Sequence, residues 1–261
     1  MRGFILAAGL GSRLRPLTDG LPKPLVLVAG VPLLQRAIEQ LVAAGVSQIG
    51  VNTFHLGEQI AAFVGDGSRF GAQITVFAEA PRILGTGGGL KNAEQFLAAG
   101  GDTFVLANGD VWHDFDLRGL CAAHVAGTAA TLMVHRAAHR PELHQVFVRQ
   151  HGLDRGQVAH IRGQPVTVAS DFAVIYCGVG VYSTSVLETI PAATEACLVR
   201  RGMEPALAAG QAIGYWEPLG AWFDCGTRAE VLRASAFALR QRAAKTDTLR
   251  TGAAKTSAAA I

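Results

Sequence analysis

Residues 1–24 read MRGFILAAGLGSRLRPLTDGLPKP. Positions 4–7 form a short apolar run that predicts a buried parallel strand, and the run opens directly into a loop containing Gly9 and Gly11. Glycines let a backbone approach a ligand closely, and consecutive N–H groups in such a loop can point at an anion. The pattern therefore indicates an α/β fold with a phosphate site at the carboxyl end of its first strand.

Two positive side chains follow this loop. Arg13 carries a planar guanidinium suited to phosphate, and Lys23 stands between Pro22 and Pro24, which predict a rigid, extended segment. The combination predicts a polyphosphate site. It matches neither common phosphate motif, because Leu14 replaces the third glycine of a dinucleotide fingerprint and no GxxxxGK[ST] sequence occurs.

Strand-like and helix-like segments alternate along the rest of the chain. Expected strands lie at 48–53, 73–77, 103–107, 130–135, 172–182 and 213–218, and expected helices at 31–45, 56–64, 90–98, 117–125, 186–190, 196–209 and 227–242. This alternation predicts an α/β fold with a Rossmann-like, mostly parallel sheet sandwiched by helices.

The domain organisation follows from where this pattern weakens. Between about 137 and 170 only two short β-like pieces remain, at 146–149 and 157–161, which we interpret as a small β-rich insertion. Residues 1–243 are then expected to form a single domain. Residues 244–261 are rich in Ala, Thr and Lys and are expected to be a disordered tail.

Composition and charge limit the classes of binding partner. Half of the 261 residues are hydrophobic, 16% are charged, and the net charge is only +3 without a basic run, which argues against a nucleic-acid partner. Four widely spaced cysteines without a CxxC motif argue against disulfides or zinc and favour buried thiols in a reducing cytosol. No apolar run approaches the roughly 18 residues of a membrane span. We expect a cytoplasmic monomer or small homo-oligomer with no membrane partner.

Two acidic residues are candidate metal ligands. Asp110 ends the sequence Asn-Gly-Asp after an apolar strand, and Asp224 lies in Trp-Phe-Asp-Cys-Gly-Thr just before the last helix. Two carboxylates converging on a triphosphate make an oxygen site suited to Mg²⁺. The alternatives are an Asx turn for Asp110 and a favourable helix N-terminal charge for Asp224.

A run of glycines, Gly-Thr-Gly-Gly-Gly at 85–89, precedes the expected helix 90–98. Each glycine inside a helix costs about 0.5–1 kcal/mol against alanine, and close approach to a flat nucleobase would offset that cost. The alternative is a flexible helix N-terminus. Backbone donors and acceptors suit a pyrimidine edge and favour UTP. Glu79 would offer an acceptor for the exocyclic amine of guanine, which leaves GTP open.

Taken together, these motifs resemble those of the sugar-1-phosphate nucleotidylyltransferases, GxGxRLxPLT followed by PKP, and every position matches. NGD at 108–110 and WxDxGT at 222–227 match as well. The TGGG run looks most like the N-acetylmuramate-1-phosphate uridylyltransferase branch of peptidoglycan recycling. The resemblance implies the nucleotide-diphospho-sugar transferase type of fold and transfer of a nucleoside monophosphate from UTP to a sugar 1-phosphate, with release of pyrophosphate. The alternative is a mannose- or heptose-1-phosphate guanylyltransferase.

The resemblance also implies roles for single residues. Arg13, Lys23 and Asp110 would be catalytic, and Asp110 and Asp224 would hold Mg²⁺. Tyr176 and Gly178 match the aromatic-x-Gly strand under the sugar phosphate. Many relatives carry Glu-Lys-Pro before that strand, and this chain does not. The implied nucleotide-binding set is Ala8, Gly9, Gly11, Ser12, Arg13, Lys23, Gly85, Thr86, Gly87, Gly88 and Asn108.

Two other functions fit parts of this pattern. A glycosyltransferase on the same kind of sheet would also bind a metal–diphosphate through an acid pair, but has little use for Arg13 and the Pro-Lys-Pro segment. A nucleotide-sugar-binding regulatory subunit without turnover would be expected to lack Arg13, Lys23 or one of the acids, and all are present.

Overall fold

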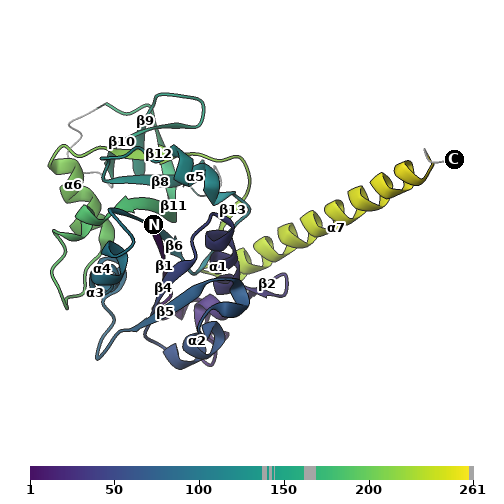
Figure 1. The fold of residues 1–261 in the computed structure, drawn as a ribbon, viewed down its shortest axis with the longest axis horizontal. Coiled ribbons are helices and arrows are strands. Elements are labelled where there is room, and N and C mark those ends of the chain that lie inside the picture. Colours follow the sequence, from purple (N-terminus) through teal and green to yellow (C-terminus); the bar gives the residue numbers. More distant parts are fainter. Residues whose placement is uncertain (137–139, 141–142, 144, 162–168, 259–261) are drawn as a thin grey trace.

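The computed structural model describes residues 1–136, 140, 143, 145–161 and 169–258. A nine-stranded sheet in the order β5-β4-β1-β6-β11-β8-β12-β10-β9 forms its centre, with helices packed around it (Figure 1). The strands of this sheet are β1 (Arg2–Leu6), β4 (Gln48–Thr53), β5 (Gln73–Ala78), β6 (Thr103–Asn108), β8 (Ala130–His135), β9 (Val146–Gln150), β10 (Arg155–Ile161), β11 (Phe172–Ser183) and β12 (Ile213–Trp216).

Two small two-stranded sheets and the helices complete the described structure. The small sheets pair β2 (Leu27–Val28) with β3 (Val31–Pro32) and β7 (Val111–His113) with β13 (Trp222–Asp224). The α-helices are α1 (Leu33–Ala43), α2 (Gly57–Val64), α3 (Gly85–Asn92), α4 (Glu94–Ala98), α5 (Leu117–Ala123), α6 (Glu204–Ala208) and α7 (Arg228–Ala258). Short 3₁₀-helices are η1 (Ser12–Leu14), η2 (Lys23–Leu25), η3 (Ser68–Phe70) and η5 (Thr184–Leu187), and η6 (Val199–Met203) is a π-helix.

The sheet is parallel in the half that carries the glycine loop. There β1 pairs in parallel with β4 and β6, so that Phe4 lies between Gly50 and Leu106. Strand β11 runs antiparallel to both β6 and β8, and the sheet as a whole is therefore mixed. The predicted α/β fold is confirmed, and the parallel half brings the carboxyl ends of β1, β4 and β6 to one edge.

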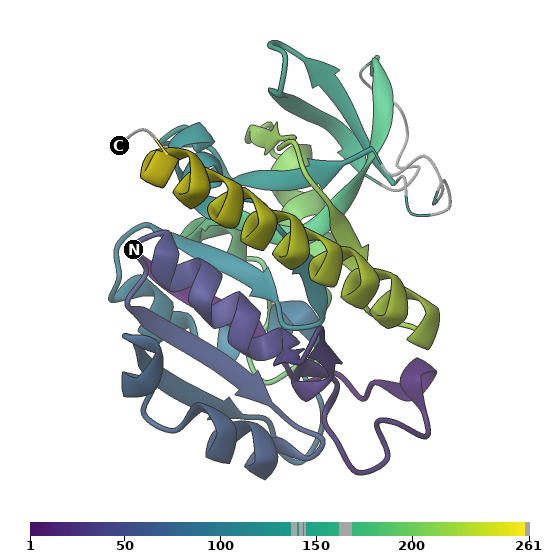
Figure 2. The same ribbon diagram turned by 90° about the vertical axis from the view of Figure 1, so that its right-hand side faces the viewer.

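Alternate side chains of β1 bury against helices on opposite faces. Ile5 packs with Ile38 and Leu41 of α1 on one face, and Phe4 packs with Leu90 and other side chains from α3 and α4 on the other. Each fully buried side chain of this size stabilises the fold by about 1.5–3 kcal/mol. Figure 2 shows α1 and α7 on the same side of the sheet.

Several expected elements differ in the structure. The helix expected at 90–98 begins at Gly85 and is interrupted at Ala93, while the helix expected at 196–209 forms only as η6 and α6. Lys23 lies in a 3₁₀ turn rather than an extended segment. The strands expected inside the insertion, β9 and β10, join the edge of the main sheet; residues 137–139, 141–142, 144 and 162–168 of that insertion lie outside the described part.

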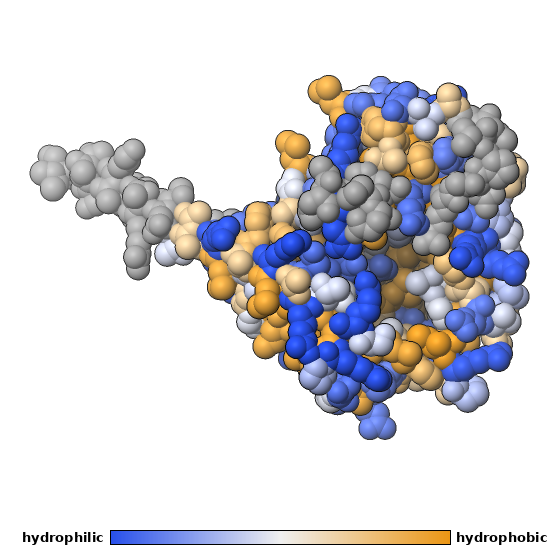
Figure 3. Space-filling view, turned by 180° about the vertical axis from the view of Figure 1, so that it is seen from behind, coloured by the Kyte–Doolittle hydropathy of each residue, from blue (hydrophilic) through white to orange (hydrophobic). Residues whose placement is uncertain are grey.

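Helix α7 runs through most of residues 244–261, which the sequence predicted to be a disordered tail and of which 259–261 lie outside the described part. It extends to Ala258 and its last turns project from the body (Figure 1). Alanine, leucine, lysine and arginine favour helix, and extending an existing helix avoids the cost of nucleation. Over the body, Figure 3 shows hydrophilic side chains interspersed with apolar ones. Within the described residues, none of the helices is both apolar and long enough to cross a membrane.

Candidate active site

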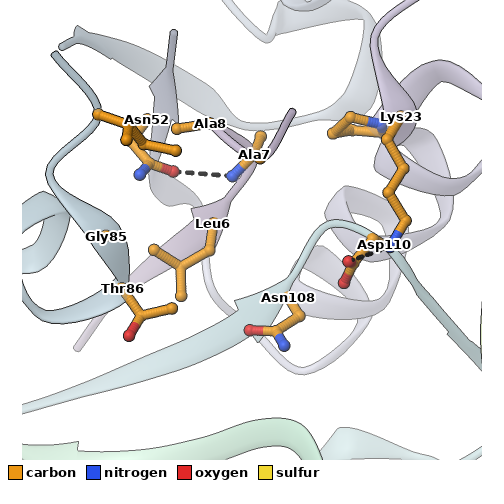
Figure 4. Close-up of a pocket in the computed structure, with 12 residues that line it drawn as sticks. Leu6, Ala7, Ala8, Lys23, Asn52, Gly85, Thr86, Asn108 and Asp110 are labelled. Carbon is orange, nitrogen blue, oxygen red and sulfur yellow. Dashed lines mark hydrogen bonds and ion pairs between the residues drawn. The ribbon is translucent and has the colours of Figure 1, made fainter. Parts of the chain in front are cut away.

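A pocket of about 570 Å³ opens where β1 and β6 end. Gly85 and Thr86 bound one side of it, and Lys23 with Asp110 bounds the other (Figure 4). The remaining lining residues are Leu6, Ala7, Ala8, Gly9, Pro24, Asn52, Ile83 and Asn108. Six of the eleven residues predicted to bind the nucleotide therefore line one cavity, namely Ala8, Gly9, Lys23, Gly85, Thr86 and Asn108.

A buried hydrogen-bond chain supports this pocket. Asn52 accepts from the backbone N–H of Ala7 (2.7 Å) and donates from Nδ2 to Glu79 Oε1 (2.7 Å), while Glu79 Oε2 accepts from the N–H of Leu84 (2.6 Å). Glu79 is buried and both its oxygens are engaged, and it does not line the pocket. The acceptor that would recognise guanine is thus committed to the protein's own backbone and Asn52.

Lys23 and Asp110 form an ion pair at the mouth of this pocket. Lys23 Nζ lies 2.5 Å from Asp110 Oδ2, with the lysine side chain 8% exposed and the aspartate side chain 33% exposed. The turn that carries the lysine is closed by the Leu25 N–H donating to the Pro22 carbonyl (2.8 Å). Such charge-assisted bonds are about twice as strong as neutral ones, so Lys23 is held at a fixed place beside the cavity.

A second pocket, of about 950 Å³, adjoins the first and shares Asn108 and Asp110 with it. Both candidate metal ligands line it, because β7 pairs with β13 and the Cys225 N–H donates to the Asp110 carbonyl (3.2 Å). The other lining residues are Arg13, Val111, Leu143, Gln145, Val146, Ile161, Ile175, Tyr176, Cys177, Gly178, Val199, Met203, Trp222 and Asp224.

Arg13 lines the second pocket and not the first, which contains Gly9. A side chain at Gly226 would place its Cβ 2.6 Å from Arg13 Nη2 and 3.0 Å from Asp224 Oδ1, so a glycine at this position leaves room for both the guanidinium and the carboxylate. The arginine therefore lies in the pocket that also contains the two acids.

Tyr176 and Gly178 both line the second pocket. Gly178 has a left-handed backbone (φ +77°), and a Cβ there would lie 2.5 Å from Asn108 Nδ2. The Tyr182 hydroxyl donates to the Tyr176 hydroxyl (2.7 Å), and burial raises the pKa of Tyr176, so its phenol stays neutral. Gly178 thus allows Asn108 to reach the boundary of both pockets.

Four predicted nucleotide-binding residues do not line either pocket. Gly11 is left-handed (φ +64°) and precedes η1, its carbonyl accepting from the Thr18 hydroxyl (2.8 Å), and Ser12 is exposed. Gly87 and Gly88 are buried, and their N–H groups donate to the carbonyl of Ala196. Contacts within the protein therefore account for the glycines at these positions.

Sequence reasoning missed other residues of the two pockets. Asn52 could have been found from the sequence, because it is a polar residue near the carboxyl end of the otherwise apolar strand 48–53. Val199 and Met203 offered none, because only the tertiary structure brings η6 to the second pocket.

Two buried groups beside the acids stay neutral. Burial raises the pKa of the Cys225 thiol to about 12, with Asp110 adding to the effect. Burial, assisted by Arg36, lowers the pKa of His113 to about 3, and Gln40 Nε2 lies 3.0 Å from its Nδ1. The charge of this region is therefore set by the carboxylates, Arg13 and Lys23.

The sequence model of the nucleotidyl transferase family matches residues 2–241. The chain belongs to this family. An N-acetylmuramate alpha-1-phosphate uridylyltransferase from Neisseria meningitidis serogroup B is 36% identical, over 91% of this chain and 98% of its own length. A mannose-1-phosphate guanyltransferase from Gibberella zeae is 33% identical over 87% of this chain, which spans only 61% of that relative.

The fold of this nucleotidyltransferase is also shared with solved structures. A UTP-bound UGPase from Acinetobacter baumannii superimposes with a TM-score of 0.73 at 20% identity, covering 90% of this chain and 92% of that one. At this identity the likeness concerns the fold alone. The family membership and the fold agree with the predicted enzyme class.

Proposed function

We propose that this enzyme transfers UMP from UTP to a sugar 1-phosphate, with N-acetylmuramate 1-phosphate as the preferred acceptor. The observation that carries the proposal is the pair of adjoining pockets that share Asn108 and Asp110. A nucleotide in the first and a sugar phosphate in the second would meet at these two residues. The uridylyltransferase relative, which this chain covers almost completely, supports the choice of both substrates.

The reaction needs positioning and charge stabilisation rather than a covalent nucleophile. An oxygen of the sugar phosphate attacks the α-phosphorus of UTP in line, the bond to the β-phosphate oxygen breaks, and pyrophosphate leaves. The backbone at Ala8 and Gly9 borders the phosphates, Lys23 neutralises charge growing on the α-phosphate, and Arg13 binds phosphate oxygens from the side of the second pocket.

Asp110 and Asp224 fit a Mg²⁺ ion. Their carboxylates line the same pocket, and the described residues contain no cluster of three or more His, Cys, Asp or Glu side chains that would form an all-protein site. Mg²⁺ is commonly bound by one or two carboxylates, with phosphate oxygens and water completing its shell. When bound, the ion neutralises charge on the phosphate groups of both substrates.

The base is expected to be uracil rather than guanine. The engagement of both Glu79 oxygens removes the acceptor that guanine would need, and a buried polar group left unpaired costs about 1–3 kcal/mol. With N-acetylmuramate 1-phosphate as acceptor, the enzyme acts in peptidoglycan recycling in the cytoplasm, on no nucleic acid and no membrane.

A pyrophosphate-release assay tests the proposal. UTP and GTP are each combined with N-acetylmuramate, mannose and glucose 1-phosphates, and kcat/KM is compared across the six pairs, with Asp110→Asn as the inactive control. We expect UTP with N-acetylmuramate 1-phosphate to give the highest value. A preference for GTP with mannose 1-phosphate would replace the proposal with a guanylyltransferase, the function named for the Gibberella zeae relative.

A further inference from the structure

One segment of backbone, from Thr194 to Met203, contacts the boundaries of both pockets. The carbonyl of Ala196 accepts from the N–H groups of Gly87 (2.8 Å) and Gly88 (3.3 Å), and its own N–H donates to the carbonyl of Leu84 (2.9 Å). Two residues later, the N–H of Leu198 donates to the hydroxyl of Thr86 (2.9 Å). The segment is therefore fixed to the start of α3, which bounds the nucleotide pocket.

The glycines of α3 allow this segment to pack closely against the start of the helix. A Cβ at Gly85 would lie 2.8 Å from the Ala196 carbonyl oxygen, and one at Gly87 would lie 3.0 Å from the Leu198 nitrogen. At Gly88 it would fall against the carbonyl of Thr194. Close approach of the protein's own backbone thus requires glycine at these three positions of the run, independently of the predicted contact with a base.

Immediately after Leu198 the chain forms the π-helix η6, whose Val199 and Met203 line the second pocket. π-helices are rare and are frequently found at functional sites. Val199 and Met203 therefore form an apolar wall of the second pocket, and Leu143, Ile161 and Ile175 are further apolar residues of its lining. Other lining residues of that pocket, Arg13, Asp110 and Asp224 among them, are charged.

The apolar wall favours one class of sugar. The 2-substituent of an unsubstituted hexose is a hydroxyl group, and a hydroxyl buried against apolar side chains loses its hydrogen bonds with water. The acetyl group of an acetamido sugar carries a methyl group at this position instead, and burial of that methyl group against apolar side chains is favourable. A pocket lined both by charged residues and by this apolar wall therefore suits the 1-phosphate of an acylated amino sugar.

We propose that Val199 and Met203 select 2-acylamino sugar 1-phosphates, and that Thr86 is a positioning residue that holds this wall through Leu198. The proposal rests on the function proposed above in one respect, that the second pocket receives the sugar. It does not depend on the lactyl group that distinguishes N-acetylmuramate.

The first experiment uses N-acetylglucosamine 1-phosphate and glucose 1-phosphate, which differ only in the 2-substituent. With UTP fixed and saturating, kcat/KM is measured for each, or the inhibition constant against N-acetylmuramate 1-phosphate where turnover is too slow. We expect the acetamido sugar to be preferred about 10-fold or more, as for other small groups in apolar pockets. Val199→Thr, which keeps the shape and adds a hydroxyl, should reduce this ratio at least threefold.

Val42→Thr is the matched control, because Val42 is a half-buried residue of α1 outside both pockets and should leave the ratio unchanged. A ratio near one in the unmodified enzyme, an unchanged ratio in Val199→Thr, or failure of both sugars to bind would overturn the proposal. Weak use of N-acetylmuramate 1-phosphate with the acetamido preference retained would instead overturn only the function proposed above.

The second experiment tests Thr86. Thr86→Val keeps the shape but removes the acceptor for the Leu198 N–H, and Thr86→Ser retains a hydroxyl. Because Thr86 also lines the nucleotide pocket, both KM values are measured; we expect Thr86→Val to raise the KM of the sugar phosphate about fivefold or more, by a larger factor than the KM of UTP, and to reduce the acetamido preference. Thr86→Ser should restore both values. A raised KM for UTP with unchanged sugar parameters would make Thr86 a nucleotide ligand and refute its positioning role.

Discussion

Substitutions at Gly178 and Gly210 form a matched pair that measures how much the contact between Gly178 and Asn108 contributes to stability and to turnover. Both have φ +77°, so alanine at either position is placed in the left-handed region, at a cost of about 1–2 kcal/mol. A Cβ at Gly210 would have no heavy atom within 4 Å, whereas one at Gly178 would lie 2.5 Å from Nδ2, 2.8 Å from Cγ and 3.1 Å from Cβ of Asn108. The two substitutions therefore differ mainly in the displacement of Asn108.

The expected effects follow from this geometry. Gly210→Ala should lower the free energy of unfolding by about 1–2 kcal/mol and leave turnover unchanged. Gly178→Ala should cost a further 1–3 kcal/mol or so, as overpacking does in a filled interior. Because Asn108 lines both pockets, its displacement should also lower kcat at least 10-fold, since misplacement by about 1 Å can cost as much as 10²-fold.

Two measurements on both variants test this reasoning. Guanidinium chloride unfolding gives the change in the free energy of unfolding, and pyrophosphate release with UTP and a saturating sugar 1-phosphate gives kcat. Equal losses of stability in the two variants, together with unchanged kcat in Gly178→Ala, would refute the argument that Gly178 sets the position of Asn108.

Three further predictions concern charge. Lys23→Ala should lower kcat about 10²-fold while raising the KM of UTP less, because the role proposed for this buried lysine is to neutralise charge that grows on the α-phosphate; steady-state kinetics showing only a raised KM would contradict this. Asp224→Asn should raise the Mg²⁺ concentration for half-maximal activity at least 10-fold, and an unchanged Mg²⁺ titration would remove Asp224 from the metal site. His113 has a pKa of about 3 when folded against about 6.5 when unfolded, so its contribution to stability is lost as pH falls from about 6.5 towards 3. Between pH 7 and pH 5 the resulting loss in the free energy of unfolding is about 2 kcal/mol. His113→Gln, whose amide can still contact Gln40, should remove this part of the pH dependence, as measured by denaturant titrations at both pH values. The same pH dependence in both proteins would contradict the prediction.

Local sequence was sufficient where local backbone chemistry decides the outcome. The apolar run before Gly9 predicted strand β1, at whose end a pocket opens, and the Asn-Gly-Asp and Trp-Phe-Asp motifs singled out Asp110 and Asp224, which line one pocket. Each of these depends on a few adjacent residues. The position of ligand sites at the carboxyl ends of parallel strands then follows from the handedness and order of β-α-β units.

Contacts between distant parts of the chain decided which residues of the two pockets come together. Pairing of β7 with β13 brings the two acids to one pocket, and Gly226 makes room for Arg13 beside Asp224, although more than 200 residues separate the two. The run Gly-Thr-Gly-Gly-Gly was recognised in the sequence, but its packing against the backbone of Ala196 was not, because Ala196 lies over 100 residues further on. A side chain's neighbours across the fold are set by the packing of whole elements, and one-dimensional periodicity records only which face of an element is apolar.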